Sequence, residues 1–124
     1  MNPVKLVGPR ITLREFNTDD IDAVHALIGD DRVTRWLSFD SRTREQAAAM
    51  IDGVLQRTQE QPRAEYYLAA TLGDSSLIGF ARLGLTGVKA AKLGYAIAAD
   101  AWGNGYATEA TQLIINFGFD ELGR

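Results

Sequence analysis

The chain has 124 residues, 46% of them hydrophobic, and a net charge of −3, so it is long enough for one domain and too short for two. The acidic balance argues against a nucleic-acid-binding surface, and the absence of an 18-residue apolar run argues against a membrane span. With no cysteine, the chain has no disulfide, no thiolate metal site and no cysteine nucleophile, and we expect one soluble cytoplasmic domain over residues 1–124 that binds no metal.

The first predicted elements are a strand and a helix. Residues 10–16, RITLREF, alternate apolar and polar side chains, which is typical of a half-buried strand. Thr18, followed by two aspartates, is a suitable helix start, because its side chain can accept a hydrogen bond and acidic residues favour the positive helix end. Apolar residues follow at helical spacing over 21–28, and Gly29 is expected to end this helix.

A second helix is predicted after a short helical turn around residues 33–37. Thr43 and Gln46 have the spacing of a capping box, in which each side chain bonds the other residue's backbone N–H. An apolar stripe follows, and the helix must end before Pro62 because the residue preceding a proline disfavours helical geometry.

From residue 66 to about residue 98, the sequence pattern predicts strands instead of helices. Residues 66–72, 77–85 and about 88–98 are the three predicted strands. The separators, 73–75 and 86–87, are short enough for hairpins, so these strands form an antiparallel meander. A last helix is predicted from about Thr108 to Leu122. The order strand, two helices, three antiparallel strands and helix indicates an α+β fold.

Two glycines stand between the last strand and the last helix, in the segment Trp102-Gly103-Asn104-Gly105-Tyr106-Ala107. Glycines permit backbone conformations that side chains forbid, and they let a ligand approach the main chain. The first N–H groups of a helix lack internal partners, so a strand, a glycine turn and a helix start together suit a phosphate. A tight turn without a ligand is an equal alternative for this spacing alone. The segment lacks the lysine and serine of a P-loop, and Thr108 departs from the dinucleotide-binding pattern.

The segment GYAIAADAWGNGYATEA, residues 94–110, resembles motif A of the GCN5-related N-acetyltransferases (GNAT). More narrowly, it is similar to the RimJ/RimL branch, which acetylates the N-termini of ribosomal proteins. The opening RITLREF and the triplet Thr-Asp-Asp at 18–20 are also typical of that branch, and the resemblance extends over residues 8–123. It implies a mixed, mainly antiparallel sheet flanked by helices.

The resemblance also implies a cofactor site. In the family, backbone N–H groups of the turn bind the pyrophosphate of acetyl-CoA. The pantetheine arm pairs with the edge of the preceding strand, where a bulge separates the central strands. The residues implied in cofactor binding are therefore Ile97, Ala98, Ala99, Trp102, Gly103, Asn104, Gly105, Tyr106, Ala107 and Thr108. Arg35 and Trp36 lie where this branch tends to line the acceptor pocket, although a tryptophan there is more often part of the core.

No catalytic residue is assigned. Many relatives have a glutamate that acts as general base where this chain has Lys92, and an ammonium group cannot take a proton. Tyr95 is a weak catalytic candidate, more often a ring packed in the core, and Glu109 is more often a carboxylate favoured by the helix dipole. A surface or half-buried role is expected for His25. Arg42, Arg44, Arg57 and Arg63 are expected on a solvated face.

In the family, the fold continues past motif A with a strand, a helix and usually two more strands. This chain ends at Arg124, so we expect either a fragment or a homodimer in which the missing strands come from elsewhere. The expected function is an N-acetyltransferase that moves an acetyl group from acetyl-CoA to the primary amine of a peptide N-terminus or a small molecule. Direct attack needs no covalent intermediate, and a backbone N–H would stabilise the oxyanion. The alternatives are a non-catalytic acyl-CoA-binding module and an inactive truncated fragment.

Overall fold

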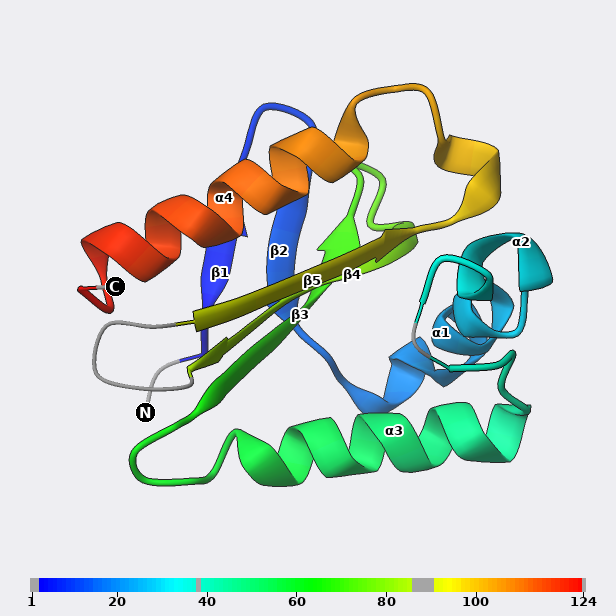
Figure 1. Ribbon diagram of the computed structural model, residues 1–124, viewed down its shortest axis with the longest axis horizontal. Coiled ribbons are helices and arrows are strands. Elements are labelled where there is room, and N and C mark those ends of the chain that lie inside the picture. The colour runs from blue at the N-terminus through cyan, green and yellow to red at the C-terminus, as the bar shows by residue number, and fades with distance from the viewer. Residues whose placement is uncertain (1–2, 38, 86–90, 124) are drawn as a thin grey trace.

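The computed structural model describes residues 3–37, 39–85 and 91–123. In this part of the chain, five strands form one antiparallel sheet in the order β1-β2-β3-β4-β5, with helices on both faces (Figure 1). The α+β class predicted from the sequence is confirmed. The elements in chain order are β1 (Lys5–Val7), β2 (Thr12–Glu15), η1 (Thr18–Asp20), α1 (Ile21–Ile28), α2 (Asp31–Thr34), α3 (Arg44–Arg57), β3 (Glu65–Thr71), β4 (Leu77–Leu85), β5 (Ala91–Ile97), η2 (Ala99–Ala101) and α4 (Tyr106–Asp120).

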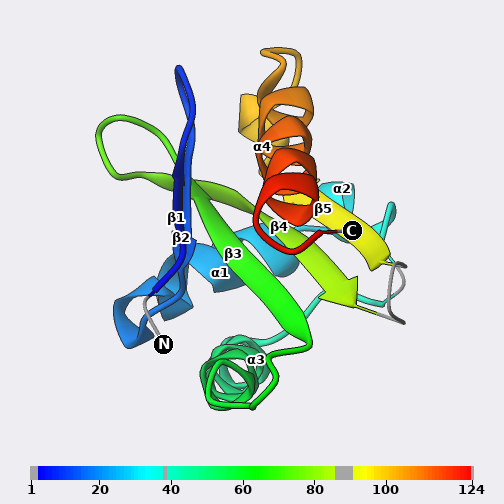
Figure 2. The ribbon, with the colours of Figure 1, turned by 90° about the vertical axis from the view of Figure 1, so that its left-hand side faces the viewer.

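The helices form two layers around the sheet. Figure 2 shows α4 on one face, and α1 and α3 on the other. The buried strand β3 contributes to both cores because successive side chains of a strand point to opposite faces. Tyr66, Leu68 and Ala70 belong to the cluster under α4, whereas Tyr67 and Ala69 belong to the cluster under α1 and α3. A strand buried on both faces explains why this segment lacks apolar–polar alternation.

The element boundaries agree closely with the sequence patterns. The predicted strand 77–85 and helix 21–28 coincide with β4 and α1, and β3 and α4 differ from prediction by one or two residues. The strand predicted at 10–16 is shorter in the structure, and the three-residue β1 was not predicted because so short a run has no period. The separator 86–87 and the start of the strand predicted at 88–98 lie outside the described residues.

Of the two helix caps predicted from the sequence, one is confirmed and the other is wrong. Thr43 and Gln46 form the predicted capping box, with N···O distances of 2.9 and 3.1 Å. At the first helix, the prediction of Thr18 is wrong, because a 3-10 turn precedes α1 and Asn17 is its cap. Asn17 and Asp20 exchange backbone and side-chain hydrogen bonds in a capping box one residue earlier.

An ion pair near the edge of the sheet overturns one expectation. Arg63 is 5% exposed, and its guanidinium donates two hydrogen bonds, of 2.7 and 2.8 Å, to the carboxylate of Glu15. The group also lies 4.4 Å from the ring centroid of Tyr66. The prediction of a solvated face for Arg63 is therefore wrong, because a partner on β2 allows its charge to be buried. The side chains of Arg44 and Arg57 are exposed, as expected.

Two classes of feature are missing from the described ranges. No helix there combines the length and the apolar character needed to cross a membrane. No group of three or more histidine or acidic side chains is placed there to bind a metal ion.

Candidate functional site

The glycine turn has the predicted backbone geometry. Gly103 and Gly105 have φ angles of +82° and +77°, in the region that L side chains rarely adopt. Gly105 is the N-cap residue of α4, which begins at Tyr106. A Cβ atom added at Gly103 would meet no atom within 4 Å, so the space beside the turn is open.

The backbone N–H groups of residues 103–108 have no hydrogen-bond acceptor among the described residues. They lie at the start of a 15-residue helix, where the aligned peptide dipoles add partial positive charge. Unpaired N–H groups and a positive helix end are the two requirements of an anion site in a strand–turn–helix segment. The turn can therefore bind a phosphate group.

An ion pair that the sequence patterns did not predict connects this turn with the chain just before β2. Glu109 accepts hydrogen bonds from the backbone N–H groups of Arg10 and Ile11, at 2.8 and 2.7 Å, and from Nε of Arg10, at 2.9 Å. Arg10 in turn donates a 2.5 Å hydrogen bond to the carbonyl of Asn104, inside the turn. Burial opposes the charged form of Glu109, but these donors outweigh it and lower the pKa of the carboxyl. No sequence spacing signals a contact between residues so far apart.

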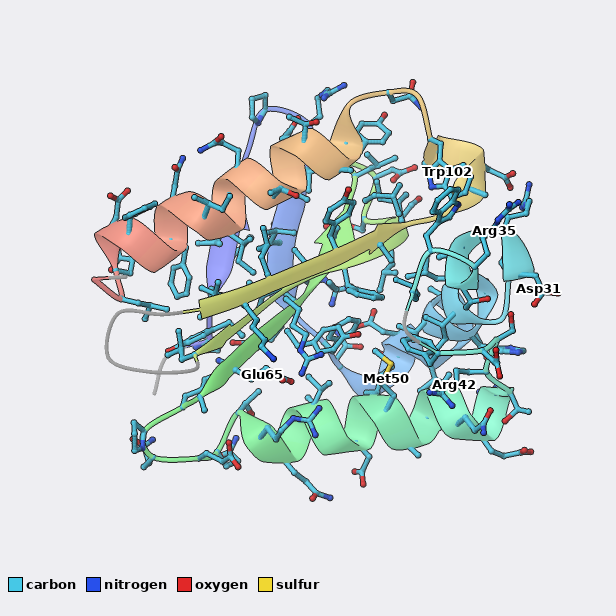
Figure 3. The ribbon with its side chains drawn as sticks, in the orientation of Figure 1. Asp31, Arg35, Arg42, Met50, Glu65 and Trp102 are labelled. Carbon is cyan, nitrogen blue, oxygen red and sulfur yellow. The ribbon has the colours of Figure 1, made fainter. Side chains whose placement is uncertain are left out.

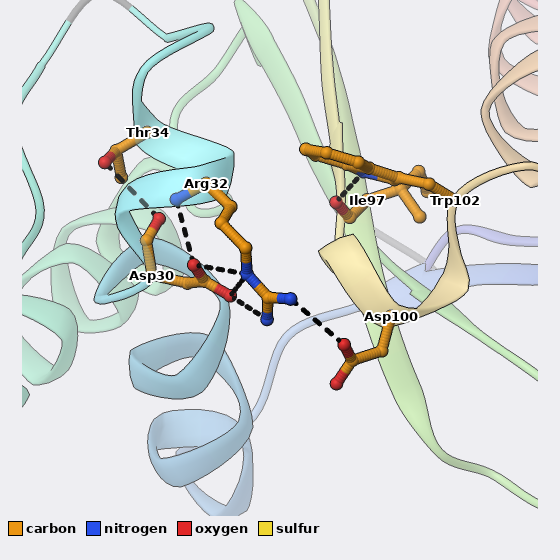
Figure 4. Close-up of polar contacts among 6 residues, drawn as sticks. All are labelled: Asp30, Arg32, Thr34, Ile97, Asp100 and Trp102. Atoms are coloured by element: carbon orange, nitrogen blue, oxygen red, sulfur yellow. Dashed lines mark hydrogen bonds and ion pairs between the residues drawn. The ribbon is translucent and has the colours of Figure 1, made fainter.

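The end of β5 presents backbone groups on an edge that pairs with no other described strand. The N–H of Ala98 bonds the carbonyl of Ile78 at 2.7 Å, and Ile97 lies opposite Gly79. Because hydrogen bonding alternates along an antiparallel pair, the peptide groups of Ile97 point away from β4. The carbonyl of Ile97 accepts a 2.7 Å hydrogen bond from Nε1 of Trp102 (Figure 4).

The bulge that the resemblance implies near Ile97 does not interrupt the pairing of β4 with β5, and it stays a prediction for the other edge of β5. The register of β4 and β5 is continuous from Leu85↔Ala91 to Gly79↔Ile97. A register shift occurs instead between β3 and β4, at Ala70 and Thr71.

A second ion pair connects η2 with α2. Arg32 pairs with Asp30 at 2.8 Å and with Asp100 at 3.3 Å (Figure 4). All of these side chains are at least partly exposed, so the pair adds little stability. It does fix α2 beside the segment that leads into the glycine turn.

A cavity of about 820 Å³ runs along the free edge of β5. Six of the eleven aromatic side chains of the chain line it, together with aliphatic residues and one arginine. The lining residues are Val33, Trp36, Leu37, Phe39, Tyr67, Phe80, Arg82, Leu93, Gly94, Tyr95, Ala96, Ile97, Trp102 and Ala107. Figure 3 labels Trp102 and Arg35 at the end of the sheet where η2 and α2 lie.

Two aromatic residues are placed differently from the expectation. Trp36 and Tyr95 line the cavity and are 73% and 49% exposed, so the interpretation of either as a core residue is wrong. Tyr95 lies on a strand that has a neighbour on one side only among the described residues, and Trp36 follows a helix of one turn. Sequence period alone cannot reveal that an apolar side chain lies at an edge.

Other candidates lie outside the cavity. Arg35 lines a neighbouring shallow depression that shares Phe39 with it, and Lys92 is exposed on β5. His25 is half-buried on α1, as expected. Among the described residues, no carboxylate and no histidine lines the cavity. Burial raises the pKa of the Tyr67 hydroxyl, so this group stays protonated and cannot act as a base.

The comparisons with known proteins agree on one family. Residues 10–124 match the family model of the acetyltransferase (GNAT) domain. The uncharacterized N-acetyltransferase YoaA of Bacillus subtilis is 30% identical over 117 residues, which make up 92% of this chain and 66% of YoaA. The chain thus spans slightly less than two thirds of that relative.

Two solved structures have the same fold. A GNAT-family acetyltransferase from Bacillus anthracis superposes with a TM-score of 0.82 at 21% identity, covering 97% of this chain and 69% of that one. RimJ from Mycobacterium smegmatis, solved in complex with CoA-disulfide, has a TM-score of 0.78 at 18% identity, covering 99% of this chain and 66% of that one.

Proposed function

Because the chain belongs to the GNAT acetyltransferase domain family, we propose that it transfers an acetyl group from acetyl-CoA to a primary amine. The observation on which this proposal rests is the glycine turn, with its unpaired N–H groups, at the mouth of an apolar cavity along β5. A phosphate site and an apolar cavity joined by a strand edge suit a long cofactor that has a phosphate at one end and a thioester at the other.

The residues of this chain fit such a cofactor. The N–H groups of residues 103–108 would bind the pyrophosphate, with no side chain in the way at Gly103. The outward carbonyl of Ile97 would pair with the pantetheine arm, while Ala107 and Ile97 line the cavity that receives its end. The complex of RimJ with CoA-disulfide supports this choice of cofactor.

The chemistry that fits the cavity is direct attack. Bound acetyl-CoA would supply the thioester: the amine nitrogen would bond to the acetyl carbon, the C–S bond would break, and CoA would leave as a thiolate that takes a proton from water. The N–H of Ile97 points to the free edge and would donate to the developing oxyanion. With no carboxylate or histidine among the described lining residues, the amine would enter in its neutral form and lose its proton to water.

A second candidate function is an acyl-CoA-binding module without catalysis. The observation that favours it is the same lack of a proton acceptor in the described cavity lining. The two functions share the cofactor site and differ in whether the thioester is consumed.

One experiment separates them. The protein is mixed with acetyl-CoA and a panel of primary amines, and free CoA thiol is measured against time. An acetyltransferase releases thiol in proportion to amine, whereas a binding module gives calorimetric CoA binding without release. If neither binding nor release is found, the proposed cofactor site is wrong.

A further inference from the structure

The rings that line the cavity form a floor and a rim. Tyr67 and Phe80 are 8% and 4% exposed, and their ring centroids lie 4.9 Å apart at the floor. The rim is made of exposed side chains: Trp36, Leu93, Tyr95 and Trp102 are between 43% and 73% exposed. Exposed apolar side chains that are gathered around a concavity, rather than scattered, mark a binding surface.

The charged side chain that lines the described cavity is an arginine. Arg82, the charged lining residue among those described, donates to Glu65 at 2.6 Å and lies 5.5 Å from the ring centroid of Tyr67. Arg35 lies 5.3 Å from the ring centroid of Trp36. These two guanidinium groups already occupy ring faces where an ammonium group would otherwise bind. A ligand with several positive charges would therefore be repelled by Arg82 at the floor.

Among the described residues, no acidic side chain lines the cavity. Glu65 pairs with Arg57 as well as with Arg82, so its charge is compensated. Asp31 and Asp40 line the neighbouring shallow depression instead of the cavity. A ligand that combines one amine with a neutral, flat, apolar body matches both the rings and the charges.

We propose that the acceptor is a primary amine on an aromatic body, with its ring packed against Trp36 and Tyr95 and its amine directed to the end of β5. This inference rests on the proposed acetyl transfer and narrows its acceptor. Aromatic rings packed edge-to-face or offset attract one another beyond the effect of burial, so several rings together can select such a body.

The test is the rate of acetyl transfer with three probes that share a primary amine: tryptamine, spermidine and a hexapeptide with a free N-terminal serine. We expect kcat/KM for tryptamine to exceed that for either other probe at least about tenfold, or about 1.4 kcal/mol. An equal or higher value for spermidine or for the peptide would overturn the aromatic class and leave acetyl transfer intact.

Variants of the rim residues test which side chain is responsible for the preference for an aromatic amine. Trp36→Ala should raise KM for tryptamine about tenfold and leave KM for n-butylamine, which has no ring, unchanged, while Trp36→Phe should retain most of the affinity. The matched control is Phe119→Ala, which removes another ring, 66% exposed on α4 and outside the cavity. Equal losses for both amines in Trp36→Ala, or a loss in Phe119→Ala, would contradict the assignment.

Calorimetry decides the ligand class even if no amine is acetylated. Tryptamine should bind the CoA-loaded protein more tightly than spermidine does. The variant Arg35→Glu should reduce this difference in affinity, because it should improve the binding of spermidine. Failure of acetyl transfer alone would then refute the proposed function, whereas tighter spermidine binding would refute the aromatic acceptor.

Discussion

The carboxylate of Glu109, in the first turn of α4, bonds both the backbone N–H and Nε of Arg10, at 2.8 and 2.9 Å. Since Arg10 also donates to the carbonyl of Asn104, the pair joins the chain just before β2 to the glycine turn. The turn thus owes its shape to a contact between opposite ends of the sequence as well as to its own glycines.

The first prediction concerns this pair. Glu109→Gln keeps the shape of the side chain but turns an acceptor of Arg10 Nε into a donor, so the turn should loosen. We expect unfolding free energy to fall by about 1–2 kcal/mol and CoA affinity to fall about fivefold. Chemical denaturation and calorimetry measure the two effects. Glu45→Gln, in the first turn of α3, is the control and should change neither.

The second prediction is a pH dependence. Donors at Glu109 outweigh its burial and hold its pKa below the ordinary 4.5. Stabilisation from a lowered pKa is complete above the unfolded-state value and is lost as pH falls through the folded-state value. The stability gap between wild type and Glu109→Gln should therefore be constant from about pH 6 to about pH 5 and shrink below about pH 4.5. Urea denaturation at stepped pH measures it, and a gap unchanged down to about pH 3 would refute the assignment.

The third prediction concerns the glycine turn. In Gly105→Val, a β-branched residue would have to adopt a φ of +77°, and its side chain would meet Arg10 Nη2, 3.3 Å from the added Cβ. We expect CoA affinity to fall at least about tenfold, or about 1.4 kcal/mol. Gly73→Ala, in an exposed turn with open space around it, is the control that should bind CoA normally. Wild-type affinity in Gly105→Val would mean that CoA binds elsewhere.

The fourth prediction follows from the hydrogen bond between Trp102 and the carbonyl of Ile97. A cofactor arm that pairs with this carbonyl would bind beside the indole N–H, because a carbonyl oxygen has two lone pairs, and it would change the surroundings of the Trp102 ring. CoA should therefore change the tryptophan emission of Trp36→Phe, which retains Trp102. Trp102→Phe, which retains Trp36, is the control and should show a smaller change. Unaltered emission of Trp36→Phe at saturating CoA would contradict pairing at Ile97.

The fifth prediction tests the buried ion pair. Arg63→Met should lower the unfolding free energy by about 3–5 kcal/mol, because it leaves the carboxylate of Glu15 without its cation. Arg44→Met breaks an exposed pair with Asp22 and should cost at most about 0.5 kcal/mol. Similar losses of unfolding free energy in the two variants would show that burial does not decide how much an ion pair contributes to stability.

The local features of this protein follow from its sequence. The helix over 21–28, the strand over 77–85 and the capping box of Thr43 and Gln46 depend on periodicity and on neighbours within one helical turn, and the structure agrees with each. The positive φ angles at Gly103 and Gly105 are equally local, because only residues without a Cβ adopt them without strain.

Tertiary structure alone decided which distant side chains meet. Two ion pairs, Arg10–Glu109 and Arg63–Glu15, join residues that are far apart in the sequence and that no helical or strand spacing relates. Glu109, expected only as an acid at a helix start, and Arg63, expected on the surface, therefore stabilise the fold through these partners. The same holds for Trp36 and Tyr95, whose rings line a cavity instead of the core. A sequence pattern records that a side chain is apolar, but its burial depends on which elements pack against it, and the described elements leave both rings largely exposed.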